Sequence, residues 1–180
     1  MNTILKSLLV VGAAGFVAAC ASVGAGAAAP VDQMADEADV RRVVHAIDLA
    51  VDDKDWPAAR ERFTDEIYAD FTSLVGGEPA TIPADALVGG WSANLGPKKT
   101  SYHQRGYVHV TVAGDEAVAV SNGYAWNRME GNGDPLWEVW GRYEHTLTRT
   151  GAGWKVDGMT FEATHERGNM WVRDTPSPAN

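Results

Sequence analysis

The residues best suited to chemistry in this chain are an aspartate near the end of an apolar helical pattern and a histidine in a later alternating segment. Asp52 begins an Asp-Asp-Lys-Asp-Trp run, and His103 follows a Thr-Ser-Tyr run. A carboxylate that orients an imidazole and stabilises its charged form makes the histidine a competent general base near neutral pH. If the fold brings the two side chains together, the pair predicts proton abstraction by a lyase or an isomerase.

Each member of this pair also has a structural interpretation. Asp52 could face water at the C-terminal end of a helix, where a carboxylate interacts unfavourably with the helix dipole, so its replacement would cost little stability. His103 could be a strand histidine with no role in chemistry. If the two side chains lie apart, a non-catalytic ligand-binding or dimerisation module becomes the better hypothesis. A third hypothesis is a reaction that uses Asp52 or Asp70 alone as the base.

The first half of the chain predicts three helices around a short hairpin. Residues 36–52 carry an apolar stripe at three- and four-residue spacing, which indicates an amphipathic helix. Asp55 can cap a second helix that runs to Phe63. Residues 67–75 alternate, Gly76-Gly77 indicates a turn, and residues 79–82 return as a strand. Pro83 opens a third helix, whose apolar face is formed by Leu87, Trp91 and Leu95.

From Thr100 onward the apolar pattern has a period of two, which predicts strands. Segments 108–112, 117–129, 136–150 and 154–165 alternate and are separated by glycine-rich turns. Helices followed by an antiparallel meander predict an α+β domain with the helices on one face of the sheet. We place this single domain at residues 36–168 and predict a disordered tail at residues 169–180.

Residues 1–35 resemble an export segment rather than part of the fold. Residues 1–19 hold one charge, Lys6, and a twelve-residue apolar run that is too short to span a bilayer. The run ends in Val-Ala-Ala-Cys20, which resembles a bacterial lipobox whose cysteine is lipidated. An ordinary signal peptide cut within residues 25–29 is the alternative. We therefore expect an exported, membrane-anchored lipoprotein facing the periplasm or the cell exterior, with residues 20–35 as a flexible tether.

The charge balance argues against nucleic acid as a partner. The formal net charge is -9, and Cys20 is the only cysteine, so no disulfide can form within the chain. Acidic proteins without a basic stripe bind the phosphate backbone of nucleic acids poorly. We expect Lys98 and Lys99 to lie in a solvated loop. The histidines show no metal-ligand spacing, so we expect no metal and no cofactor.

The order of these elements, with the Gly-Arg-Tyr-Glu-His and Gly-Trp-Lys-Val motifs near the end, resembles the SnoaL-like branch of the nuclear transport factor 2-like superfamily. The resemblance covers residues 36–168. It implies a cone, in which the N-terminal helices pack in the concave face of a strongly bent, mostly antiparallel sheet and a pocket opens at one end. Superfamily members often dimerise through the sheet, so a homodimer of this chain is one of the alternatives.

Within this branch the chain looks most like scytalone dehydratase and hexachlorocyclohexane dehydrochlorinase, both of which remove a proton and expel a leaving group. The resemblance implies that Asp52 and His103 are the catalytic pair. The second histidine of the dehydratase has no counterpart here, because the aligned region offers Asn127 and Arg128, and Phe71 stands where the dehydratase has a pocket tyrosine. Arg149 stands near the position of a dehydrochlorinase arginine, although it could equally be a solvated strand-end charge.

Aromatic side chains are frequent where a pocket would lie, with seven tryptophans in the chain. Such residues form the apolar walls of small-molecule sites, although each could instead be core packing. We therefore expect a small hydrophobic or aromatic ligand. The expected substrate-binding residues are Phe71, Trp91, Tyr102, Tyr124, Trp126, Trp140, Glu144 and Arg149.

Overall fold

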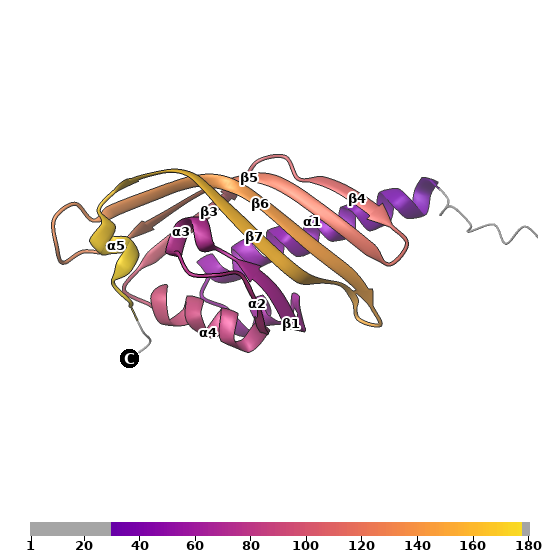
Figure 1. Ribbon diagram of the computed structural model, residues 1–180, viewed down its shortest axis with the longest axis horizontal. Coiled ribbons are helices and arrows are strands. Elements are labelled where there is room, and N and C mark those ends of the chain that lie inside the picture. Colours follow the sequence, from indigo (N-terminus) through magenta and orange to yellow (C-terminus); the bar gives the residue numbers. More distant parts are fainter. Residues whose placement is uncertain (1–29, 178–180) are drawn as a thin grey trace, which may run out of the picture.

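The computed structural model describes residues 30–177 of the 180-residue chain. These residues form an α+β domain in which one curved sheet arches over the helices (Figure 1). The helices are α1 (Pro30–Asp52), α2 (Trp56–Arg60), α3 (Thr72–Val75), α4 (Ala84–Asn94) and α5 (Met170–Asp174). The strands are β1 (Phe63–Asp70), β2 (Ala80–Pro83), β3 (Thr100–Arg105), β4 (His109–Ala113), β5 (Glu116–Arg128), β6 (Leu136–Thr150) and β7 (Gly153–Gly168).

The sheet is open and mostly antiparallel. Its strand order is β2-β1-β7-β6-β5-β3, and β4 pairs with the other end of β5. The one parallel pair is β1 with β7. Two register shifts between β6 and β7, at Trp140/Gly141 and at Thr146/Leu147, interrupt the ladder, and such bulges bend strands. The long strands therefore curve around the helices instead of forming a flat sheet.

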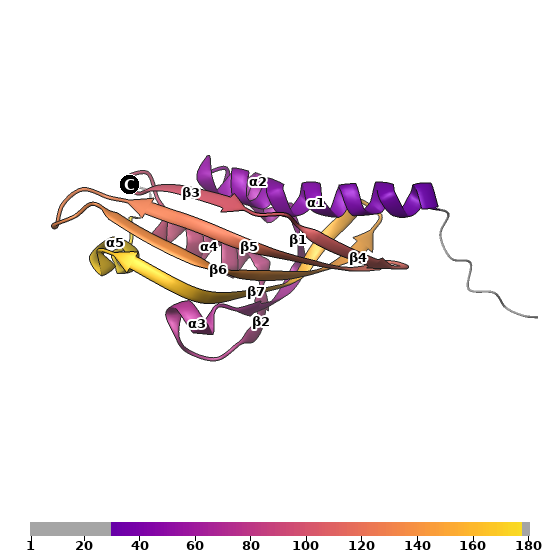
Figure 2. The same cartoon turned by 90° about the horizontal axis from the view of Figure 1, so that it is seen from above.

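Helix α1 lies along the β3 and β4 side of the sheet, as the view from above shows (Figure 2). Its Val40, Val44 and Ile47 are fully or almost fully buried, which confirms the stripe predicted from the sequence. After the helix, Lys54 takes a left-handed backbone conformation with φ of 62°. The turn brings Asp55 to the start of α2, where its side chain accepts a hydrogen bond from the backbone N–H of Ala58 at 3.1 Å.

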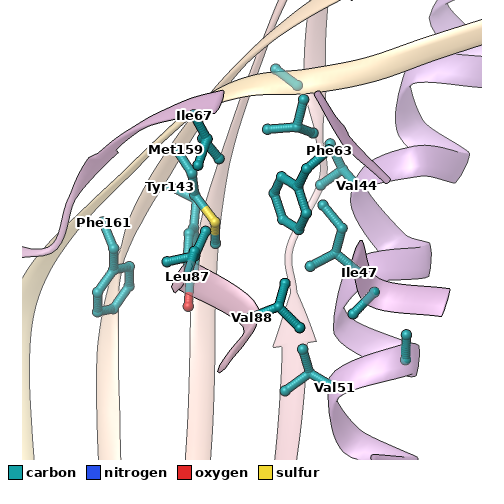
Figure 3. Packing of buried hydrophobic residues seen from close by; sticks show 14 of the residues in the cluster. Val44, Ile47, Val51, Phe63, Ile67, Leu87, Val88, Tyr143, Met159 and Phe161 are labelled. Carbon is teal, nitrogen blue, oxygen red and sulfur yellow. The ribbon is translucent and has the colours of Figure 1, made fainter. Parts of the chain in front are cut away.

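The core fills the space between α1, α4 and the concave face of the sheet. Ile47 and Val51 of α1 pack toward Phe63 of β1 and Val88 of α4, and Tyr143 and Phe161 line the sheet side (Figure 3). Phe63 and Ile67 have no exposed surface. Burial of this apolar surface is the main term that holds the helices against the sheet.

The structure differs from the sequence-based expectation at several boundaries. The second helix ends at Arg60, and Phe63, its expected last residue, is the first residue of β1. Helix α1 begins at Pro30, so part of the expected tether is helical. The expected strand through Val75 ends at Asp70, because the Asp70 carboxylate accepts hydrogen bonds from the backbone and the hydroxyl of Thr72 at 3.0 and 2.7 Å and starts α3 there. The signal segment, with Cys20, and residues 178–180 lie outside the described residues.

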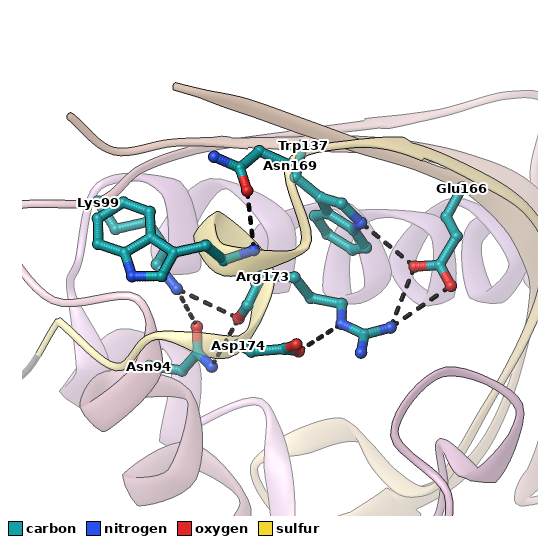
Figure 4. Close-up of polar contacts among 8 residues, drawn as sticks. Asn94, Lys99, Trp137, Glu166, Asn169, Arg173 and Asp174 are labelled. Atoms are coloured by element: carbon teal, nitrogen blue, oxygen red, sulfur yellow. Dashed lines mark hydrogen bonds and ion pairs between the residues drawn. The ribbon is translucent and has the colours of Figure 1, made fainter. Parts of the chain in front are cut away.

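Two further differences concern the C-terminal segment and Lys99. Asn169 caps α5 by accepting a hydrogen bond from the backbone of Trp171, so the expected tail is helical where it begins. Lys99 is fully buried, and its ammonium group donates to the side chain of Asn94 at 2.7 Å and to the carbonyl of Arg173 at 3.4 Å (Figure 4). The expectation of a solvated loop is therefore wrong for Lys99 and correct for its exposed neighbour Lys98.

Between residues 30 and 177, no helix combines the length and the apolar character that a membrane span requires.

Candidate active site

Asp52 and His103 are in direct contact. The Asp52 Oδ1 atom lies 2.7 Å from Nδ1 of His103, and Asp52 Oδ2 accepts a hydrogen bond from the backbone N–H of His103, also at 2.7 Å. Both oxygens of one carboxylate therefore hold one residue of the neighbouring strand. This arrangement fixes the position of the imidazole and places the proton of the neutral ring on Nδ1, which leaves the Nε2 lone pair free.

The surroundings of Asp52 keep it ionised. Burial by itself would raise the pKa of the Asp52 carboxyl, but the hydrogen bonds and charge of His103, with a contribution from the Ser101 hydroxyl, lower the pKa below 3.8. Lys54 donates to Ser101 Oγ at 2.5 Å, so a cation supports the carboxylate from the far side. Burial, opposed by the charge of Asp52, lowers the pKa of Lys54 from its ordinary value.

A second acid–base pair lies one helical turn before the first. Arg105 donates two hydrogen bonds to Asp48, from Nε at 2.5 Å and from Nη2 at 2.7 Å. The side chains are 2% and 10% exposed, so this ion pair belongs to the interior. Four residues of a helix rise about 6 Å and two residues of a strand rise about 6.6 Å. The spacings match, so α1 and β3 can form both pairs in register.

Next to these pairs lies a cavity of about 600 Å³ between α1, α3, α4 and the sheet. His103 is in its wall, whereas Asp52 stands behind His103 and is not part of the lining. Most of the wall is apolar, from residues such as Val51, Leu87 and Met159. The cavity is large enough for a small ring compound, and apolar walls with few polar groups are typical of ligand sites.

Two of the expected aromatic residues line this cavity. Trp91 of α4 packs edge-on against Phe71, with ring centroids 6.4 Å apart, and against Phe63 at 5.9 Å. Phe71 and Trp91 both contribute to the lining. A ligand in this cavity would therefore be in reach of both side chains.

Four other aromatic residues lie on the opposite face of the sheet. Tyr102 stacks on Trp126 at 5.7 Å, and Tyr124 packs on Trp140 at 5.0 Å. The expectation that they line the cavity is wrong. In β3 the side chains of His103 and Arg105 face the cavity, so Tyr102, one residue before His103, faces outward. Each of the two aromatic contacts is a cross-strand pair.

Glu144 and Arg149 are also outside the cavity. Glu144 is exposed on β6, next to the inward-facing Tyr143. Arg149 is exposed and forms ion pairs with Asp36 at 2.6 Å and with Asp115 at 3.1 Å, while its guanidinium carbon lies 4.4 Å from the centre of the Trp154 ring. Arg149 is thus the surface charge that the alternative interpretation describes.

The sequence analysis did not select Asp48, Arg105 or Tyr143, which all line the cavity. The signal for Arg105 was available, because it stands two residues after His103 and therefore on the same face of its strand. The signal for Asp48 was its four-residue separation from Asp52 on the helix. The signal for Tyr143 was the period-two alternation of β6, because Tyr143 shares its face of the strand with Trp137 and Val139, which also line the cavity.

Comparison with protein families places this geometry in a known context. Residues 32–160 match the SnoaL-like domain. The chain belongs to this family. A search of curated proteins found no match to the chain.

Solved structures with the same fold share little sequence with this SnoaL-like domain. A protein from Kribbella flavida has a TM-score of 0.73 at 23% identity, over 78% of this chain and 98% of that chain. A scytalone dehydratase candidate from Novosphingobium aromaticivorans has a TM-score of 0.64 at 17% identity, over 76% and 90%. A type 2 hexachlorocyclohexane dehydrochlorinase has a TM-score of 0.61 at 12% identity, over 84% and 95%. At these identities the likeness establishes the fold.

Proposed function

We propose that this SnoaL-like domain catalyses proton abstraction from a small, largely apolar ring compound, with His103 as the general base. The observation that carries the proposal is the double contact of Asp52 with His103, made where His103 forms part of the cavity wall. The reaction class is a lyase, in which a leaving group departs, or an isomerase, in which the proton returns elsewhere. Dehydratase-type proteins among the solved structures support this class.

The residues divide the work in a simple way. The Nε2 lone pair of His103 accepts the proton, and the ring becomes an imidazolium. Asp52 stays ionised, holds the Nδ1 proton and stabilises the new positive charge. The apolar wall around Phe71 and Trp91 holds the ring of the substrate and limits access of water.

The first prediction tests the pair directly by imidazole NMR. In the wild type, the contact of the Asp52 carboxylate with Nδ1 should hold His103 as one tautomer, so Asp52→Asn should mix the two tautomers. Asp53→Asn is the matched control, because Asp53 is exposed and adjacent. An unchanged tautomer of His103 in Asp52→Asn would remove the basis of the proposal.

The same variants should separate catalysis from binding. The rate of α-proton exchange in D₂O is measured for ring ketones and hydroxyketones, and the rate of chloride release is measured for chlorinated cyclohexanes. Asp52→Asn and His103→Gln should each lower the rate by about 10² to 10⁴, and the double variant should lose little more than the worse single variant, since the residues act as one unit. If wild type binds these compounds without exchange, the domain is a ligand-binding module.

We also propose that the domain is exported and held at a membrane by lipid on Cys20. The support is the apolar run that ends in Val-Ala-Ala-Cys20. Two or more acyl chains anchor firmly, whereas one binds marginally.

The second prediction tests this anchor. Cys20→Ala should release the protein from the membrane fraction or block its processing. Ser22→Ala, two residues later, is the control and should leave fractionation unchanged. A mature N-terminus downstream of Cys20, measured by intact mass, would contradict the anchor.

A further inference from the structure

Lys54 has an unfavourable backbone conformation, two residues after Asp52. Its φ is 62°, and no other non-glycine residue between residues 30 and 177 has a positive φ. A left-handed backbone is strained for a residue with a side chain, and such strain is concentrated at functional sites. Glycine would suit this turn better. The conformation therefore directs attention to what the lysine side chain does.

The surroundings of the Lys54 ammonium group are also unfavourable. Burial lowers the pKa of Lys54, and the charge of Asp52 opposes this effect. The group lies close enough to the buried Lys99 to help lower the pKa of that second lysine. Its Nζ atom is 6.0 Å from the centre of the Trp56 ring, which is a weakly attractive contact. The Asp52 carboxylate is thus the charged partner that favours a cation at this position.

Ser101 connects Lys54 to Asp52. Ser101 is only 5% exposed, and its Oγ atom accepts a hydrogen bond from Lys54 Nζ at 2.5 Å. A serine hydroxyl has one proton to donate. Because the oxygen already accepts from Lys54, this proton is available to Asp52, and the hydrogen bond from Ser101 helps to lower the pKa of Asp52. Asp52 therefore has a third hydrogen-bond donor beside its two contacts with His103.

Neither Lys54 nor Ser101 lines the cavity. Within the described part of the chain, the lining residues include His103 but not these two. A lysine beside a serine can activate the hydroxyl as a nucleophile, but a nucleophile must reach its substrate. Ser101 stands two residues before His103 and so lies on the same face of β3. An influence of the two residues on chemistry in the cavity therefore passes through Asp52.

We propose that Lys54 and Ser101 are positioning residues for the base His103. The inference rests on the proposed function. Lys54 donates to Ser101, Ser101 donates to Asp52, and Asp52 accepts from Nδ1 of His103, so a chain of hydrogen bonds leads from the turn after α1 to the cavity wall. Hydrogen bonds in such a chain strengthen one another. The chain keeps Asp52 ionised and directed at Nδ1, which leaves Nε2 free to accept the proton of the substrate.

The test follows the Asp52 carboxyl group by NMR titration of the full chain without a ligand. Lys54→Met removes the ammonium group at an unchanged turn and should raise the pKa of Asp52. Ser101→Ala should raise it as well, and Lys54→Met should then add a smaller effect, because the connection is already broken. Lys54→Arg keeps the charge and should restore most of the wild-type value. Lys98→Met, which removes an exposed charge, is the control and should change nothing.

A further variant separates the side chain of Lys54 from the turn. Glycine accepts a left-handed backbone without strain, so Lys54→Gly should keep the fold and still raise the pKa of Asp52 as Lys54→Met does. Thermal unfolding of each variant verifies that it is folded. A wild-type pKa of Asp52 in both variants would overturn the inference. An effect of Lys54→Met that is equal with and without Ser101 would also overturn it.

Kinetics distinguish this inference from the proposed function. For a ring ketone whose α-proton wild type exchanges in D₂O, Lys54→Met should lower kcat about tenfold, as loss of one charge-assisted hydrogen bond allows. KM should stay unchanged, because Lys54 is not in the cavity wall. A raised pKa of Asp52 in Lys54→Met, without exchange by wild type, would uphold the connection and reject the base. Equal kcat in wild type and Lys54→Met would overturn the positioning role and leave the base in place.

Discussion

At the scale of single residues, Asp52 shows how contacts reverse an argument from sequence. A carboxylate at the end of α1 meets the negative end of the helix dipole, which predicts little loss on its removal. In the fold, both of its oxygens accept hydrogen bonds from His103. These contacts offset the dipole term, because hydrogen bonds to a charged acceptor contribute more than neutral ones.

The third prediction is therefore that Asp52→Asn destabilises the domain by about 1 to 2 kcal/mol, measured by urea unfolding at pH 7. The folded-state pKa of Asp52 is depressed, so its contribution is fully present above the ordinary pKa of 3.8 and is lost as the pH falls through the lower folded-state value. The stability difference between wild type and variant should accordingly shrink below about pH 4. A variant as stable as wild type at pH 7 would restore the dipole argument.

At the scale of elements, two glycines in the long strands make room for aromatic rings, a role that the apolar pattern of the strands does not reveal. In β5, alternate residues face the cavity and the outer surface, and Gly123 supplies the gap that the Tyr143 ring fills. Gly141 of β6 has the same relation to Phe161 of β7. Small residues at these two points let aromatic rings lie close to the sheet, and so they shape the cavity wall.

The fourth prediction concerns Gly123→Ala. Its Cβ would overlap the Tyr143 ring, so we expect a loss of about 1 to 3 kcal/mol, as in other overpacked interiors, together with a displaced tyrosine. Gly89→Ala is the control, because a Cβ there meets open space on α4 and alanine favours the helix by up to about 1 kcal/mol. Chemical denaturation gives both values. Equal effects at the two glycines would mean that the β5 contact is not tight.

At the scale of the whole molecule, the C-terminal segment closes the fold. Lys99 connects Asn94 at the end of α4 to the carbonyl of Arg173 in α5, while Arg173 itself pairs with Glu166 of β7 at 3.2 Å (Figure 4). The backbone N–H of Ser177 donates to the Asn94 carbonyl at 3.1 Å. Arg173 and Asp174 line the cavity, so this segment is part of the site's enclosure.

The fifth prediction follows from the buried ammonium group of Lys99. Burial lowers its pKa to about 8, with Lys54 adding to the effect and Asp174 opposing it, against 10.5 for an unperturbed lysine. Between these values the unfolded chain binds more protons than the folded one, so the Lys99 contribution to stability rises with pH from about 8 to 10.5. The free energy of unfolding of wild type relative to Lys99→Met should rise over this range, whereas Lys98→Met should follow wild type. Parallel curves for wild type and Lys99→Met would contradict the shifted pKa.

The sequence by itself determined the local elements and the family to which they point. Periodicity of 3.6 or 2 is a property of the chain, because each helix or strand must present one apolar face to any core it joins. The stripe of α1, the Asp55 cap of α2 and the full extent of β6 could be predicted on this basis. The pairing of Asp52 with His103 was available because family resemblance brought two distant positions together.

Only the tertiary structure decided which face of each long strand meets the cavity. A strand such as β5, with the aromatic Tyr124 and Trp126 on one face and Ala125 on the other, has two usable faces, and the elements that pack against each face decide which one meets the cavity. Tyr102 and Trp140 therefore lie outside, while Tyr143 lies within. Lys99 shows the same limit, because a charged residue in a loop is buried when distant groups such as Asn94 and the Arg173 carbonyl supply its hydrogen bonds.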